Sequence, residues 1–172
     1  MEQNYIARMR AKVGHEGMIF PSAWGVLWNE NHDAILLEKR GDSKNGYGFP
    51  GGFLEYGESP MQAVVREFKE ETNLDVEVVR LLGIASHVTD KNSWGDAQET
   101  LSMGFEVRLV PGASAADLVV DGDETLAADF IPVNPRPEMF VPAAAETLER
   151  VLTENEASDQ PWLRESVSNK KA

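Results

Sequence analysis

The chain has 172 residues and a mass of 19.0 kDa, with 29 acidic against 16 basic residues and a formal net charge of -13. This charge disfavours phosphate backbones and anionic membranes, so we expect no nucleic-acid polymer and no membrane among its partners. The absence of cysteine excludes disulfides, thiolate nucleophiles and cysteine-ligated zinc. No apolar run reaches the length of a membrane span, and we expect a cytoplasmic protein.

Length and composition predict one folded domain. With 42% hydrophobic and 26% charged residues, the chain has the composition of a folded protein rather than a disordered one. Its length allows one domain with a sizeable core. We assign residues 1–155 to this single domain. Residues 156–172 are polar and are expected to form a loosely held C-terminal tail.

The first predicted strands lie at residues 22–28 (SAWGVLW) and 34–40 (AILLEKR). Both are apolar and compatible with β-structure, and the turn formers NENHD separate them, so they predict a hairpin. Residues 46–53 (GYGFPGGF) are rich in glycine and proline. They predict short extended pieces around a tight loop.

A helix is predicted over residues 60–72. Ser59 is a candidate N-cap, Pro60 suits the first helical position, and Gln62 completes a capping box. Asn73 tolerates the left-handed conformation that is common just after a helix, so we expect the helix to end there.

Further elements are predicted along the second half of the chain. Residues 76–89 and 100–110 predict strands, residues 111–125 an acidic, turn-rich loop, residues 127–133 a short strand and residues 142–154 a helix. Helices and strands interleaved around one sheet predict an α/β or α+β sandwich.

The predicted helix carries three acidic residues, Glu67, Glu70 and Glu71, on one face near its C-terminus. Each like-charge pair at this spacing costs roughly 0.2–0.5 kcal/mol. The helix dipole adds about 0.3–1 kcal/mol. A hard divalent cation such as Mg²⁺, which prefers oxygen ligands, would offset this cost. The alternative is an ordinary solvated charged face.

The segment from Gly52 to Leu74 resembles the Nudix box, G-x5-E-x7-R-E-U-x-E-E-x-G-U, in which U is aliphatic or aromatic. Glu58 and Arg66 fall at the expected spacings, and Asn73 replaces the last glycine. Since asparagine adopts positive φ more readily than most residues, the turn stays plausible. The likeness covers roughly residues 20–135. It implies a MutT/Nudix hydrolase domain, with an α/β/α sandwich and a mixed β-sheet.

The resemblance implies hydrolysis of the diphosphate in a nucleoside diphosphate linked to another group, such as ADP-ribose, a nucleotide sugar or a modified NTP. The implied cofactor is Mg²⁺, with Mn²⁺ as an alternative. The implied metal ligands are Glu67, Glu70, Glu71 and the carbonyl of Gly51. The implied catalytic residues are the glutamates Glu70, Glu71, Glu67 and Glu58, together with Arg66. Arg66 would orient the glutamates.

Substrate contacts are expected from the Gly51 and Gly52 loop. Arg40 and Lys44 precede this loop and could reach a phosphate, although ordinary ion pairs are the alternative. The general base stays open among five residues: Glu71, Glu99, Glu106, Asp123 and Glu124. Two other functions are compatible with the fold, an inactive nucleotide sensor and an isomerase. The known isomerases use a cysteine, which this chain lacks. The family also leads us to expect a homodimer.

Overall fold

The computed structural model describes residues 5–40, 46–89, 95, 97–120, 122, 125–154 and 160–164. Its α-helices are α1 (Tyr5–Val13), α2 (Pro60–Thr72) and α3 (Pro142–Glu154), and a short 3-10 helix spans Ala115–Asp117. A five-stranded sheet contains, in spatial order, β4 (Gly51–Phe53), β1 (Met18–Leu27), β6 (Gln98–Leu109), β5 (Val76–Thr89) and β8 (Trp162–Arg164). A three-stranded sheet contains β3 (Tyr47–Gly48), β2 (Ala34–Arg40) and β7 (Thr125–Pro132).

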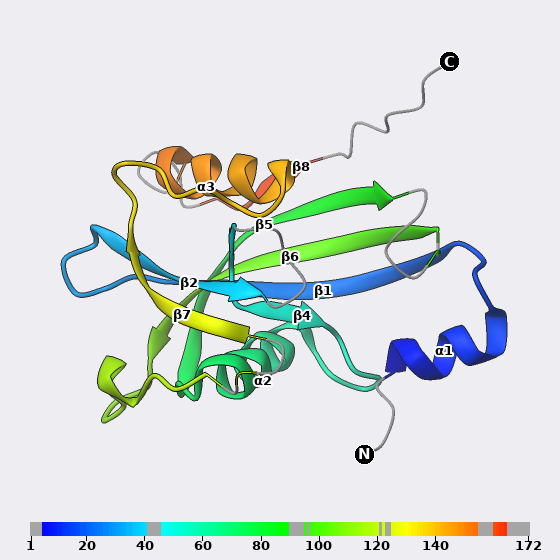
Figure 1. Cartoon of the computed structure of the whole chain (residues 1–172), viewed down its shortest axis with the longest axis horizontal. Helices are drawn as coiled ribbons and strands as arrows, with labels where there is room; N and C mark the ends of the chain where they lie inside the picture. Colours follow the sequence, from blue (N-terminus) through cyan, green and yellow to red (C-terminus); the bar gives the residue numbers. More distant parts are fainter. Residues whose placement is uncertain are drawn as a thin grey trace.

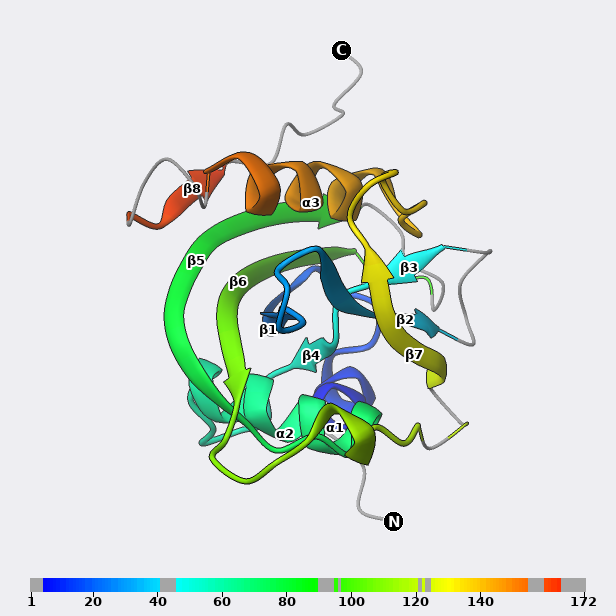
Figure 2. The ribbon, with the colours of Figure 1, turned by 90° about the vertical axis from the view of Figure 1, so that its left-hand side faces the viewer.

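The five-stranded sheet is mixed and lies between two helices. β1 runs parallel to β6 and β5 parallel to β8, while the pairs β1–β4 and β5–β6 are antiparallel. Figure 1 and Figure 2 show α2 below this sheet and α3 above it. The predicted α/β/α sandwich with a mixed sheet is therefore confirmed. None of the helices in the described ranges is long and apolar enough to cross a bilayer.

Two buried apolar clusters fill the space on either side of the sheet. The cluster between the sheet and α2 includes Val64 and Phe68 of that helix together with Phe105 and Val107 of β6. The cluster under α3 includes Leu148 and Val151 with Val26, Ile35, Leu37 and Leu82. Because successive residues of a strand point to opposite faces, both clusters draw on the same strands.

The limits of the predicted helix agree with the structure, but the predicted hairpin is wrong in its pairing. β1 and β2 are joined by the expected turn, yet they belong to different sheets and share a single bridge between Trp28 and Ile35. β1 pairs with β4 and β6 on its two edges, and β2 pairs instead with β3 and β7. Both faces of β2 are buried. Leu36 packs into the α2-side cluster, while Ile35 and Leu37 pack into the α3-side cluster.

Three described elements are absent from the sequence prediction: α1, β8 and the short 3-10 helix Ala115–Asp117. β8 lies inside the segment that was expected to be a loose tail, and it pairs with β5 through Gly83, Ile84 and Ala85. The Trp162 ring covers Gly83, where a Cβ would clash with it, and stacks on Trp24 at 6.4 Å between ring centroids. Apolar burial against the sheet therefore holds this part of the segment in place.

Replacement of Trp162 by alanine tests this anchoring. Trp162 is 9% exposed, whereas its neighbour Leu163 is 79% exposed. Trp162→Ala should lower the free energy of unfolding by about 3 kcal/mol because it empties a buried site. Leu163→Ala is the matched control and should change it by less than about 0.5 kcal/mol. Chemical denaturation measures both, and equal losses would contradict the anchoring.

Candidate functional site

The loop before α2 depends on two glycines that allow close backbone approach. Gly51 has φ of +149°, and a Cβ there would clash with the backbone of Ala23 and Trp24 in β1. A Cβ on Gly52 would clash with the carboxylate of Glu67. Gly51 therefore requires glycine, and a side chain at position 52 would displace the Glu67 carboxylate from its place beside β4.

The ends of α2 are fixed by the caps that the sequence predicts. Ser59 and Gln62 form a capping box, in which the Ser59 backbone N–H donates to Gln62 at 2.9 Å and the Gln62 N–H donates to Ser59 at 3.3 Å. Asn73 has φ of 59°, so the expected left-handed cap is confirmed. Its side chain also donates to the carbonyl of Asp117 at 3.0 Å. These caps hold the helix register and hence the positions of its glutamates.

Arg66 is the centre of the site. Its Nε donates to Glu58 at 2.8 Å and its Nη2 donates to the same carboxylate at 3.0 Å, which makes a bidentate pair. Its Nη1 lies 2.9 Å from Glu67 and 2.8 Å from Glu70. Nη2 also donates to the carbonyl of Phe53 at 3.1 Å. One guanidinium thus links the loop, β4 and the acidic face of α2.

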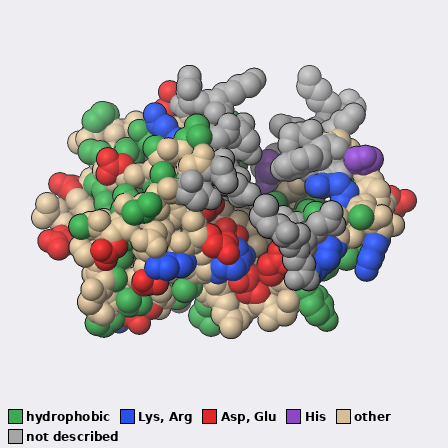
Figure 3. Space-filling model, turned by 60° about the horizontal axis from the view of Figure 1, so that its bottom comes forward, with side chains coloured by type: hydrophobic (Ala, Val, Ile, Leu, Met, Phe, Trp, Pro, Cys, Tyr) green, Lys and Arg blue, Asp and Glu red, His purple; other side chains and the backbone are tan. Residues whose placement is uncertain are grey.

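The fourth box glutamate, Glu71, is held separately. It is buried, and its Oε2 accepts a hydrogen bond from the backbone N–H of Gly51 at 2.9 Å. Glu70, by contrast, has a side chain that is 59% exposed. Figure 3 shows the side of the molecule on which α2 lies, where acidic and basic side chains gather next to each other. The acidic face therefore runs from a buried carboxylate at the loop to an exposed one.

The electrostatics of the site follow from the Arg66 contacts. Burial raises the pKa of Glu58, but the hydrogen bonds from Arg66 and the Glu55 backbone, with the charge of Arg66, outweigh it and lower that pKa below its usual value of 4.5. The hydrogen bond to Glu58 raises the pKa of Arg66, and so do the contacts with Glu67 and Glu70, against the opposing effect of burial. Both groups are therefore charged at neutral pH.

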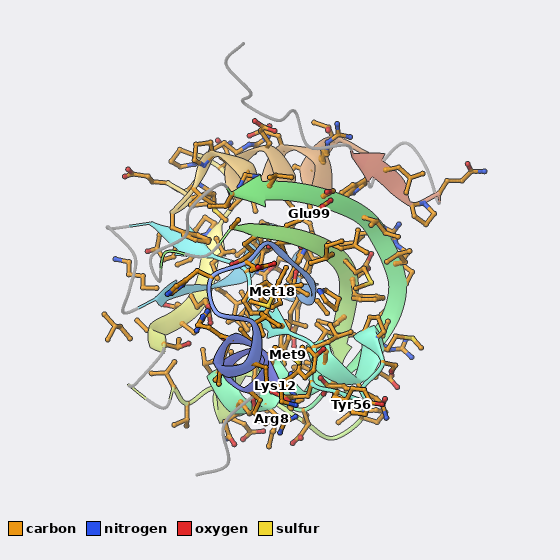
Figure 4. All side chains as sticks on the ribbon, turned by 90° about the vertical axis from the view of Figure 1, so that its right-hand side faces the viewer. Arg8, Met9, Lys12, Met18, Tyr56 and Glu99 are labelled. Atoms are coloured by element: carbon orange, nitrogen blue, oxygen red, sulfur yellow. The ribbon has the colours of Figure 1, made fainter. Side chains whose placement is uncertain are left out.

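Glu55 is a site residue that the sequence analysis missed. Its carboxylate accepts from the backbone N–H of Tyr5 at the start of α1, with both oxygens at 3.1 Å. Its own N–H donates to Glu58 at 3.0 Å, and Glu58 pairs with Arg66. Figure 4 shows α1 on the lower side of the molecule, on the same side as the labelled Tyr56 and away from α3, and the Tyr5 and Tyr56 rings stack at 6.2 Å. No local sequence signal marks this long-range contact.

The donor set fits a hard divalent cation in its chemistry, since it consists of carboxylate and carbonyl oxygens. In the described part of the chain, however, no three His, Asp or Glu side chains are grouped as a metal site. Glu67 and Glu70 point toward Arg66, and Glu71 points toward the Gly51 N–H. The positive charge of the guanidinium and the hydrogen bond from the backbone N–H thus stabilise these carboxylates.

The remaining candidates from the sequence lie elsewhere. The Arg40 side chain, Lys44, Asp123 and Glu124 fall outside the described residues. Glu99 on β6 accepts from Ser86 at 2.7 Å. Glu106 pairs with Arg80 at 2.8 Å and points away from α2, because its neighbours Phe105 and Val107 pack on the α2 side. Of the candidate bases with described side chains, Glu71 is the one that contacts the Gly51 loop.

Residues 18–151, which include the Gly51 loop and α2, match the NUDIX domain. The chain belongs to the Nudix family. It is 33% identical over 115 residues to an ADP-ribose pyrophosphatase of Methanocaldococcus jannaschii, covering 67% of this chain and 63% of the relative. It is 43% identical over 54 residues to an 8-oxo-dGTP diphosphatase of Escherichia coli, covering 30% and 42%.

Solved structures show the same similarity. A crystal structure of an ADP-ribose pyrophosphatase from Streptococcus suis has 26% identity and a TM-score of 0.60, with 85% of this chain and 98% of that chain covered. A NUDIX hydrolase from Nitrosomonas europaea has 21% identity and a TM-score of 0.67, with 85% and 77% covered, which supports the fold. The chain spans less than two thirds of the length of both curated relatives named above.

The lowered pKa of Glu58 predicts a pH-dependent contribution to stability. A carboxyl whose folded pKa lies below its unfolded value stabilises the fold above that value and loses this effect as the pH falls through the folded pKa. Glu58→Gln should therefore cost about 1 kcal/mol or more at pH 7. The difference from wild type should shrink as the pH falls below 4.5. Urea denaturation across this range measures it, and a difference independent of pH would contradict the charged pairing.

Proposed function

We propose that this protein hydrolyses the diphosphate of a nucleoside diphosphate linked to another group, with Mg²⁺ or Mn²⁺ as cofactor. The observation that carries the proposal is the Arg66 network, which gathers Glu58, Glu67 and Glu70 beside a glycine loop inside the matched Nudix region. The position of these acidic side chains near the negative end of the helix supports a role in binding a cation, because the helix dipole makes that position unfavourable by about 0.3–1 kcal/mol.

The roles of the residues follow from their positions. Glu67, Glu70, Glu71 and the Gly51 carbonyl would hold the cation, and Arg66 and Glu58 would position the first two carboxylates. When bound, the cation would neutralise the diphosphate and activate a water molecule. Gly51 contributes through its fixed backbone, since its N–H orients Glu71 at 2.9 Å. The exposed Glu70 carboxylate faces solvent, from which substrate and water arrive.

ADP-ribose is the first substrate to test. In sequence, the ADP-ribose pyrophosphatase of Methanocaldococcus jannaschii matches 67% of this chain, whereas the 8-oxo-dGTP diphosphatase matches 30%. A nucleotide sugar and a modified NTP complete the panel. Release of mononucleotide or phosphate with Mg²⁺ and with Mn²⁺ is the readout. No turnover of any member with either cation would contradict the proposal.

Glu70→Gln separates a catalytic glutamate from a structural one. The variant should lower kcat on the best substrate by about a hundredfold or more, because it removes one preorganised charge. Its stability should change by less than about 1 kcal/mol, since the ion pair is exposed. Glu77→Gln is the matched control, because Glu77 also accepts from an arginine, Arg108, at 2.7 Å. Equal activity of the two variants would overturn the assignment of Glu70.

A further inference from the structure

A cavity of about 450 Å³ lies on the face of the sheet opposite α2. Its walls come from the turn after β1, from β5 and β6, from the segment after β7 and from the C-terminal half of α3. The lining includes Trp28, His32, Arg80, Glu106, Val133 and Arg136. Glu106 fixes the face, because it alternates with Phe105 and Val107, which pack toward α2. The cavity is therefore separate from the Arg66 network.

Two guanidinium groups line this cavity in an otherwise acidic protein. Arg80 Nε lies 2.8 Å from Glu106, and both side chains are mostly buried. Arg136 donates through Nε to Glu149 at 2.7 Å and through Nη1 to the carbonyl of Val133 at 2.7 Å. A guanidinium has five N–H donors. Arg136 therefore has donors left after its contacts with the described residues, and these can bind a further acceptor. Guanidinium groups bind phosphate through charged N–H donors.

An aromatic pair forms another wall. The rings of Trp28 and His32 stack with centroids 5.5 Å apart and an interplanar angle of 24°. His32 has φ of 55°, an uncommon conformation for a residue other than glycine. The turn is held by Asn29, whose side chain donates to Asp33 at 2.6 Å and accepts from the Asp33 N–H at 3.1 Å. The turn thus places the imidazole against the indole beside the cavity, where flat rings can pack against a flat ligand.

We propose that this cavity binds a small organic anion with a planar ring, of the kind represented by a nucleoside monophosphate. The phosphate would lie against Arg80 and Arg136, and the base against Trp28 and His32. The Glu106 carboxylate would accept a hydrogen bond from a ribose hydroxyl, which a bare phosphate lacks. The volume falls within the roughly 300–1,000 Å³ of small-molecule sites. The proposal stands independently of the catalytic role of α2.

The test measures AMP binding to the whole chain in the presence of EDTA. Calorimetry gives the affinity, and NMR records the backbone amide signals of Trp28 and His32. AMP should saturate one site and shift both signals. Arg136→Gln should weaken binding by about tenfold or more, because it removes a charged donor to phosphate. Arg108→Gln is the matched control, because Arg108 forms an exposed ion pair with Glu77 outside the cavity, and it should leave AMP binding unchanged. Ribose 5-phosphate and inorganic phosphate should bind more weakly than AMP.

Three results would overturn the proposal. The first is no saturable binding at millimolar AMP. The second is binding that is lost in Arg66→Gln but kept in Arg136→Gln, which would place AMP at α2. The third is equal affinity for AMP, ribose 5-phosphate and inorganic phosphate, which would remove any role for the ring. Melting curves of Arg136→Gln and Arg108→Gln show that both variants are folded before binding is compared.

Discussion

The site depends on one interaction, the contact of the Arg66 guanidinium with three carboxylates. Glu58, Glu67 and Glu70 would repel one another on a surface whose net charge is already negative. Arg66 offsets this repulsion, with nitrogen–oxygen distances of 2.8 to 2.9 Å to each of them. An arginine suits this position because its planar group keeps its charge and offers several donors at fixed angles. The acidic face can therefore exist before any cation binds.

The rest of the fold positions Arg66 and the three carboxylates relative to one another. Gly51 allows β4 to lie close to β1, Gly52 leaves room for the Glu67 carboxylate of α2, and the caps at Ser59 and Asn73 fix the helix register. Phe68 packs on Gly25 and anchors the opposite face of the helix in the core. Glu55 then ties the loop to α1, which lies outside the residues matched to the family. Packing, capping and loop geometry thus converge on one constellation of side chains.

The sequence predicted what local rules determine and missed what long-range packing determines. The limits of α2, its capping box and its left-handed end follow from residues adjacent in the chain. The separation of β1 and β2 into two sheets depends on their pairing with other strands, β1 with β4 and β6 and β2 with β3 and β7, which no local pattern in either strand reveals. Trp162 was missed because it docks on Gly83, far away in the chain. The metal-binding role of the glutamates stays a prediction.

Arg66 forms ion pairs with Glu67 and Glu70, the carboxylates that we propose as ligands of a divalent cation. NMR can follow the Nη–H signals of Arg66 during a Mg²⁺ titration, because Nη1 is the nitrogen that contacts Glu67 and Glu70. We expect a saturable change of the Arg66 signals, because Glu67 and Glu70 loosen their bonds to Nη1 when they turn to the cation. The signal of Arg108, in the exposed pair with Glu77, should stay unchanged. Unchanged Arg66 signals at saturating Mg²⁺, or an equal change at both arginines, would contradict this proposal.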